Sequence, residues 1–207
     1  MLVGFSRVAH LLHAKPTDNR STTMADDKQI LDLYRSGERN QAFNLLVRQY
    51  GEQLYWHIRK LVASHEDAND LLQNTYVKAW NALDTFREDS KIYTWLYRIA
   101  TNEVLTFLNR KKIIGFLSIN SNEAAFERRL AADENFNGTK VQLSLQKAVN
   151  KLPPKQKVVF SLRYWEEMKY EDMAEVLDTS PGALKASYHH AYQKVVDYLK
   201  KDLDIGD

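Results

Sequence analysis

Apolar residues recur every three to four positions along most of this chain, which is the spacing of amphipathic helices. One such run extends from Ile30 to Lys112, and a second extends from Val141 to about Leu203 with a break at the Pro153-Pro154 pair. Helix-breaking residues are scarce, because the 207 residues include only seven Gly and four Pro. The pattern therefore predicts an all-α protein made of two small helical domains, the second smaller than the first.

Two stretches lack this pattern and set the expected domain boundaries. Residues 1–23 contain a short apolar stretch without the leading positive cluster of a signal peptide, so we expect a disordered extension there. The acidic segment that follows predicts a helix N-terminus, and our hypothesis is that translation begins at Met24. Residues 113–140 become polar and rich in Asn, Gly and acidic residues, which indicates a flexible linker. The predicted domains are then residues 24–112 and residues 141–207.

The composition excludes several function classes without selecting one. Lys and Arg number 29 against 27 Asp and Glu, a net charge of +2, so any nucleic-acid-binding surface must be local. The chain has no cysteine, which excludes disulfides, thiolate metal sites and cysteine nucleophiles and fits a cytoplasmic protein. No apolar run approaches the roughly 18 residues of a membrane span, so we expect no membrane insertion.

The C-terminal part of the chain has the pattern of a helix-turn-helix. Residues 170–177 form an amphipathic segment, and the turn 178–180 ends in Ser180 and Pro181, which favour an N-cap and a first helical position. The next helix should bury the apolar stripe Leu184, Tyr188, Ala191 and Val195. In a helix-turn-helix the second helix enters the DNA major groove, so its opposite face is the candidate DNA contact. That face carries Gly182, Ala183, Lys185, Ala186, His189 and Gln193.

Other interpretations of this segment stay open at this point. Two amphipathic helices joined by a short turn would have the same pattern if they only packed against each other. The adjacent His189 and His190 do not predict a metal site, because neighbours on a helix point about 100° apart and no third ligand is evident. We therefore expect no metal and no cofactor.

The first domain contains two further segments with functional potential. Residues 67–80, DANDLLQNTYVKAW, predict a helix whose polar face is either solvated or docks a partner helix. Residues 86–112 predict a loop and a helix in which aromatic residues alternate with cations. Stacking of an unpaired base on an aromatic ring is worth about 1–3 kcal/mol and neighbouring cations neutralise phosphates, so this segment can hold single-stranded DNA. Three of its apolar residues are expected in the core instead: Trp95, Leu96 and Ile99.

In this order, the segments resemble bacterial RNA polymerase sigma factors of the extracytoplasmic-function (ECF) group of the sigma-70 family. DANDLLQNTYVKAW is similar to the helix that binds core polymerase, and FREDSKIYTWLYRIATNEVLTFLNRKK is similar to the segment that recognises and opens the minus-ten element. The stretch from LPPKQKVVF to HHAYQKV resembles the domain that reads the minus-thirty-five element. The resemblance covers about residues 42–199, and three matched blocks in order are a stronger signal than any one block.

The resemblance implies a dissociable subunit that binds RNA polymerase core enzyme and promoter DNA, performs no bond chemistry and has an anti-sigma factor as a partner. It implies sigma region 2 in residues 24–112 and region 4 in residues 141–207. Matched onto this chain, the core-polymerase contacts are Asp67, Asp70, Leu71, Gln73 and Lys78. The minus-ten DNA contacts are Phe86, Arg87, Ser90, Lys91, Tyr93, Arg98, Asn102, Arg110, Lys111 and Lys112. The minus-thirty-five contacts are the six residues named above for the second helix of the helix-turn-helix.

The chain departs from the family pattern in two respects. Asn69 and Asn74 stand where members usually carry an acidic residue, so the polymerase contacts there are expected to be tuned differently. The recognition helix carries few cations, chiefly Lys185 and Lys194, where several arginines are usual. Because each cation that meets a phosphate adds to affinity and to its salt dependence, we expect thin phosphate anchoring at this helix.

Two other classes of protein compete with this interpretation. A stand-alone helix-turn-helix regulator would bind DNA without polymerase, but it leaves residues 67–80 and 86–95 unexplained. An enzyme could use the group His57, His65, Glu66 and Asp67 as acid, base or metal ligands. This group has no recognised metal spacing and no glycine-rich phosphate loop beside it, so we expect that the chain is not an enzyme.

Overall fold

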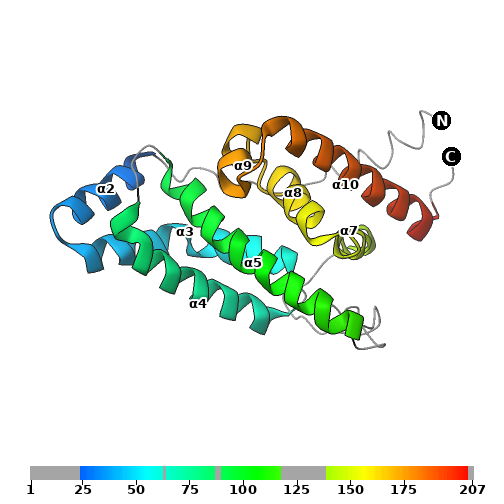
Figure 1. Ribbon diagram of the computed structural model, residues 1–207, viewed down its shortest axis with the longest axis horizontal. Helices are drawn as coiled ribbons and strands as arrows, with labels where there is room; N and C mark the ends of the chain where they lie inside the picture. The colour runs from blue at the N-terminus through cyan, green and yellow to red at the C-terminus, as the bar shows by residue number, and fades with distance from the viewer. Residues whose placement is uncertain (1–23, 63, 87–89, 118–138, 205–207) are drawn as a thin grey trace.

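The computed structural model describes residues 24–62, 64–86, 90–117 and 139–204, and this part consists of helices and turns without strands (Figure 1). The all-α prediction is thereby confirmed. The first group of helices is α2 (Met24–Arg35), α3 (Arg39–Leu61), α4 (His65–Ala82), the 3-10 helix η1 (Leu83–Thr85) and α5 (Ile92–Leu117). The second group is α7 (Lys140–Asn150), α8 (Pro154–Tyr164), α9 (Tyr170–Leu177) and α10 (Pro181–Asp202).

Helices α3, α4 and α5 pack against one another around an apolar core, and α2 packs on α3. Helix α4 begins where Ser64 accepts a hydrogen bond from the backbone N–H of Asp67, which satisfies a donor left free at the helix start. Near the C-terminal end of α4, Arg39 of α3 donates to the carbonyl oxygen of Trp80 at 2.6 Å and lies over the Trp80 ring. The core residues with the least exposure include Leu46, Leu54, Ile58, Leu96, Ala100 and Val104.

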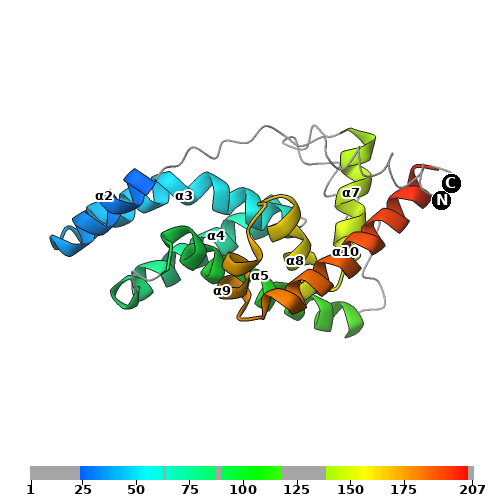
Figure 2. The same cartoon turned by 90° about the horizontal axis from the view of Figure 1, so that it is seen from above.

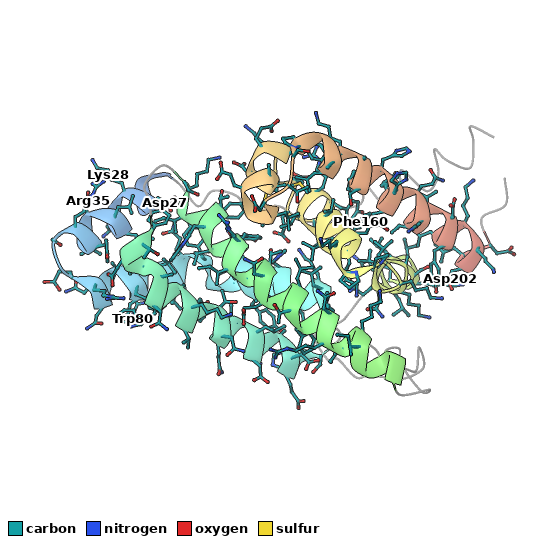
Figure 3. The ribbon with its side chains drawn as sticks, in the orientation of Figure 1. Asp27, Lys28, Arg35, Trp80, Phe160 and Asp202 are labelled. Carbon is teal, nitrogen blue, oxygen red and sulfur yellow. The ribbon has the colours of Figure 1, made fainter. Side chains whose placement is uncertain are left out.

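The second group has its own aromatic core centred on Phe160 of α8. Figure 3 labels Phe160 on α8. Its ring stacks on Tyr164 at 5.0 Å and on Tyr188 of α10 at 5.9 Å. Helix α7 begins with a capping box, in which Thr139 and Gln142 exchange side-chain to backbone hydrogen bonds. Leu145, Ala148 and Val149 of α7 pack in the same cluster as Phe160, so α7, α8 and α10 form one unit.

The two groups of helices also contact each other directly. Helix α8 packs on α3 and α5, and α9 packs on α5. Figure 2 shows α8 and α9 against the first group, while α10 runs away from it toward α7. Apolar side chains from the second group complete the core of the first: Val158, Val159, Leu162, Met168, Met173 and Val176. The expected pair of helical domains is therefore present, and the pair is closed over a shared apolar interface.

The start of the expected linker is helical rather than irregular. Helix α5 continues to Leu117, so residues 113–117 belong to it, although we predicted a linker over residues 113–140. The single Gly115 in this stretch costs a helix only about 1 kcal/mol relative to Ala, and it does not end the helix. The rest of the predicted linker up to residue 138 and the predicted extension, residues 1–23, lie outside the described residues.

His57 of α3 is completely buried where the two groups meet. Its Nε2 lies 3.3 Å from the Thr101 hydroxyl, and its Nδ1 lies 3.9 Å from Glu166 Oε1, too far for a hydrogen bond. Burial lowers the pKa of His57 from 6.5 to about 4; nearby Glu166 opposes this shift and Lys60 adds to it. The imidazole is therefore neutral in the folded protein at neutral pH.

Acidification is expected to destabilise the fold through His57. In the unfolded chain the imidazole takes up a proton near pH 6.5, whereas in the folded protein it does so only near pH 4. Stability is therefore full above about pH 6.5 and is lost as the pH falls toward 4, by at most about 3 kcal/mol. Urea unfolding across this pH range measures the loss of unfolding free energy. The His57→Gln variant should lose less stability over the same range. If the free energy of unfolding depends on pH equally in the two proteins, His57 is not the source of the acid destabilisation.

Candidate functional site

The predicted helix-turn-helix is formed by α9, a three-residue turn and α10. Asp178 ends α9 in the left-handed conformation, with φ of 49°, and the Thr179 backbone N–H donates back to the Ala174 carbonyl. Ser180 then caps α10 by accepting from the backbone N–H of Ala183, and Pro181 occupies the first turn of α10. The predicted turn, cap and first helical residue are confirmed.

The two faces of α10 divide as the sequence pattern predicted. Leu184, Ala191 and Val195 are buried, and Tyr188 is half-buried against Phe160. The opposite face has open space above Gly182, since a side chain added there would meet nothing within 4 Å. Five of the six candidate minus-thirty-five residues are exposed, Gly182, Ala183, Lys185, Ala186 and His189, and Gln193 is partly exposed. This face can approach the floor of a groove closely.

Few cations of α10 are available to anchor phosphates on this face. Lys185 is exposed with its ammonium 5.5 Å from the Tyr170 ring, so it lies beside the start of α9. Lys194 donates to Gln156 Oε1 of α8 at 2.9 Å, and Gln193 donates to Asp197 at 3.0 Å. The thin anchoring expected from the sequence therefore has a structural counterpart, because the second lysine is engaged within the protein.

Helix α5 and the loop before it carry the candidate minus-ten residues. Arg98 and Asn102 are exposed one turn apart, so they share a face, and further along α5 the basic residues Arg110, Lys111 and Lys112 are exposed. Tyr93 is partly buried with its ring 4.3 Å from the Tyr97 ring. Phe86 is partly buried with its ring 5.1 Å from Trp95. Arg87 lies outside the described residues.

Two of these candidates face acidic side chains of α9. The Lys91 ammonium forms a salt bridge with Asp172 at 2.9 Å, and the Ser90 hydroxyl donates to Glu175 at 3.4 Å. The structure thus brings the start of the candidate minus-ten surface against the first helix of the helix-turn-helix. Sequence reasoning did not foresee this contact, because the partners are more than eighty residues apart.

Helix α4 presents the candidate polymerase-binding face. Asp70, Gln73 and Lys78 are exposed, and Lys78 also pairs with Glu103 of α5. Asp67 is partly buried and accepts a hydrogen bond from Lys111 at 2.7 Å. Leu71 is only 5% exposed and packs in the core, so this candidate does not lie on the surface that a partner would touch.

One residue on the same helix was missed by sequence reasoning. Val77 is 60% exposed and lies one turn beyond Gln73, so an apolar side chain stands on the polar face of α4. The signal was present in the sequence, because Val77 falls on the polar face of residues 67–80. An apolar side chain among polar ones is a typical feature of a binding face.

The group of residues considered for an enzyme is not assembled in the structure. His57 is buried, whereas His65 is exposed on α4 and bonded to Tyr55 and Asn69. Among the described residues, no three His, Asp or Glu side chains are grouped to hold a metal ion. None of the described helices combines the length and apolar character needed to cross a bilayer.

Two family models match the chain in the same order as the helices. The model described as "Sigma-70 region 2" matches residues 46–113, which include α4 and most of α3 and α5. The model described as "Sigma-70, region 4" matches residues 142–195, which include α8, α9 and the first two thirds of α10. The candidate residues of α4, α5 and α10 therefore all fall within matched segments.

Curated relatives agree with the family models over most of the chain. RNA polymerase sigma factor YlaC of Bacillus subtilis is 32% identical over 147 residues, which cover 70% of this chain and 85% of the relative. The ECF RNA polymerase sigma-E factor of Escherichia coli K12 is 29% identical over 177 residues, covering 82% of this chain and 92% of the relative.

Two solved structures share the fold. CnrH, solved in complex with the cytosolic domain of CnrY, gives a TM-score of 0.62 at 25% identity, covering 86% of this chain and 99% of that chain. RpoE of Bartonella quintana, solved with the anti-sigma factor NepR, gives a TM-score of 0.58 at 23% identity, covering 76% of this chain and 96% of that chain.

The burial of Leu71 beside the exposed Asp70 leads to a test of their separate roles. Leu71→Ala should lower the free energy of unfolding by about 2–5 kcal/mol, because it leaves a cavity in the core. Asp70→Ala should change it by no more than about 0.5 kcal/mol, as at other surface positions. Urea denaturation of both variants measures the difference. Similar stability losses would show that Leu71 does not support the core as described.

Proposed function

Because the chain belongs to the sigma-70 family of RNA polymerase sigma factors, and within it to the ECF group, we propose that each of its exposed helix faces has one partner in transcription initiation. The protein binds core RNA polymerase and recognises promoter DNA. The observation that carries the assignment is the order of the matched segments, with regions 2 and 4 falling on the two groups of helices. The domain boundaries that we propose are residues 24–112 for region 2 and 141–207 for region 4.

We assign the minus-thirty-five element to the N-terminal half of α10. The exposed small residues there let the helix approach base edges, while Lys185 and His189 supply donors for bases or phosphates. With few cations on this face, region 4 binds weakly alone. Stable promoter binding then depends on polymerase and region 2 holding region 4 near its element, which raises the effective concentration.

We assign the minus-ten element to the exposed face of α5 and the loop before it. Extruding one base from a duplex costs a few kcal/mol, and stacking and hydrogen bonds in a pocket must supply that energy. The rings of Phe86 and Tyr93 are only partly buried and Asn102 is exposed, so these groups have suitable chemistry. Arg110 and Lys112 are exposed beside it and supply cations that neutralise phosphates, as does Lys111 once its ammonium leaves Asp67.

We assign the polymerase contact to the exposed face of α4, through Asp70, Gln73 and Lys78, with Asp67 at its edge. Leu71 is left out because it is a core residue. The linker that follows α5 is proposed to pass near the RNA exit path of the polymerase. We also propose an anti-sigma factor as a partner, since the family resemblance implies one and RpoE of similar fold was solved with one.

The alternative of a stand-alone helix-turn-helix regulator explains only α9 and α10. It assigns no role to the match with sigma region 2 or to the exposed polar face of α4. No reaction is required of the protein, because core polymerase carries out the chemistry.

Run-off transcription tests the assignment directly. Core polymerase is expected to produce new start sites on genomic fragments when this protein is added, and the protein should be pulled down with the core enzyme. The same reactions without the protein serve as the control. If no new start site appears and the core enzyme is not retained, the chain is not a functional sigma factor.

Substitutions on α10 should separate promoter reading from polymerase binding. Lys185→Ala and His189→Ala are each expected to weaken transcription from promoters that depend on the upstream element, because each loses a donor to DNA. If Lys185 meets a phosphate, its loss lowers the slope of log affinity against log salt by about 0.9. Lys201→Ala, an exposed lysine in the last turn of α10, is the matched control. Equal loss of transcription and of core binding would indicate a folding defect instead.

A further inference from the structure

We propose that Tyr34 and Arg39 are positioning residues for the minus-ten contact, because they fix the short helix η1 from which Phe86 emerges. The inference rests on the proposed minus-ten role of Phe86 and adds residues that the family resemblance does not assign. Tyr34 belongs to α2 and Arg39 begins α3, and the two side chains meet on Asp84 of η1. Phe86 lies two residues beyond Asp84.

The two oxygens of the Asp84 carboxylate are bound by two different helices. The Tyr34 hydroxyl of α2 donates to Oδ1 at 2.6 Å, and Nη1 of Arg39 in α3 donates to Oδ2 at 3.0 Å. The hydrogen bond to Asp84 raises the pKa of Tyr34, so the phenol stays protonated and donates. A carboxylate held at both oxygens from two directions cannot turn freely, so α2 and α3 together set the orientation of η1.

The Arg39 guanidinium also holds the end of α4, the helix that precedes η1. Its Nη2 donates to the Trp80 carbonyl oxygen at 2.6 Å, and its central carbon lies 4.5 Å from the centre of the Trp80 ring. Carbonyl groups in the last turn of a helix carry partial negative charge, which favours a cation there. One guanidinium thus bonds α4 and η1 at the same time, which requires the fixed fork of an arginine.

The corner between α2 and α3 keeps Tyr34 and Arg39 at a fixed spacing. Gly37 has a left-handed φ of 86°, and its backbone N–H donates to the Tyr34 carbonyl at 3.1 Å. At the other end of α2, the Asp27 carboxylate accepts hydrogen bonds from Tyr50 and Gln49 of α3. Helix α2 is therefore fastened to α3 near both of its ends, and it presents Tyr34 to Asp84 from a firm support.

Phe86 takes its direction from η1. Its backbone N–H donates to the Leu83 carbonyl at 3.2 Å, and its ring lies 5.1 Å from the Trp95 ring of α5. Leu83 is buried and fixes how deep η1 sits, whereas the Asp84 side chain fixes how η1 is turned. A binding residue must be held within about 0.5 Å of its productive position, so a small turn of η1 is enough to impair stacking of a base on Phe86.

The two positioning residues lie outside the segment that the region 2 model matches. That segment begins at residue 46, whereas Asp84 and Phe86 fall inside it. The positioning role therefore rests on contacts that this chain makes with its own α2 and the first turn of α3. It gives α2 a part in promoter opening, although α2 carries none of the candidate DNA or polymerase contacts.

Promoter opening by the full chain with core polymerase tests the positioning role. The probe is a promoter fragment recovered from the run-off reactions, and permanganate reactivity of unpaired thymines follows opening at the minus-ten element. Arg39→Ala should slow opening by about tenfold or more, because a misplacement of about 1 Å can cost about a hundredfold in rate. Tyr34→Phe, which removes only the hydroxyl, should slow it less. Arg39→Lys should not restore the parent rate, because an ammonium lacks the fork.

The matched control is Arg35→Ala, the same change in the last turn of α2, where the guanidinium bonds Asp32 instead. It should open the promoter at the parent rate. Far-UV circular dichroism and pull-down with core enzyme establish that each variant is folded and bound. Opening at the parent rate by both Arg39→Ala and Tyr34→Phe overturns the proposal, and so does equal slowing by Arg35→Ala.

An abasic nucleotide, placed at each minus-ten position in turn, tests whether Arg39 acts through the captured base. At the position where the parent protein loses most of its opening rate, Arg39→Ala should lose much less, because the stacking that the abasic site removes is already impaired. A loss of the same size in both proteins would overturn the positioning role and leave the proposed function in place. A parent protein that opens no promoter with core polymerase would overturn the proposed function, and this inference with it.

Discussion

Tyr97 is completely buried at the point where the two groups of helices meet, and its hydroxyl must find a hydrogen-bond partner there. The partner is Glu166, which is also paired with Lys60, so the phenol, the carboxylate and the ammonium satisfy one another. Removing one member leaves the others partly buried without compensation. The position of α8 and α9 on α5, and so the accessibility of Lys91, depends on this small polar cluster inside an apolar interface.

Helix α5 packs against helices on two sides and exposes polar residues on a third. One side packs on α3 and α4, another packs on α8 and α9, and the remaining side exposes Arg98, Asn102 and the basic residues 110–112. Its apolar residues are consequently spread around the helix instead of forming a single stripe. This distribution explains why Trp95 and Ile99, expected in the core, are only partly buried while Leu96 is fully enclosed.

Features set by neighbouring residues could be predicted from the sequence. The Ser180 cap, Pro181 in the first turn and the buried stripe of α10 all depend on spacings of four residues or fewer, and they occur as expected. Contacts set by distant residues could not be predicted. Lys60 and Glu166 are 106 positions apart, and no periodicity connects them. Leu71 was assigned to a binding face through the family resemblance, although its spacing from Ala68 and Ala79 already puts it on the apolar face of α4.

The shared apolar interface has a consequence for the behaviour of the protein in solution. Val159, Leu162, Met168 and Met173 are almost completely covered while the two groups are closed. Separation would present these side chains together, and contiguous exposed apolar surface promotes aggregation and proteolysis of proteins without a partner. Closure thus protects the free chain from aggregation and proteolysis. Only a molecule bound to polymerase or to another partner can stay open without exposing this apolar surface.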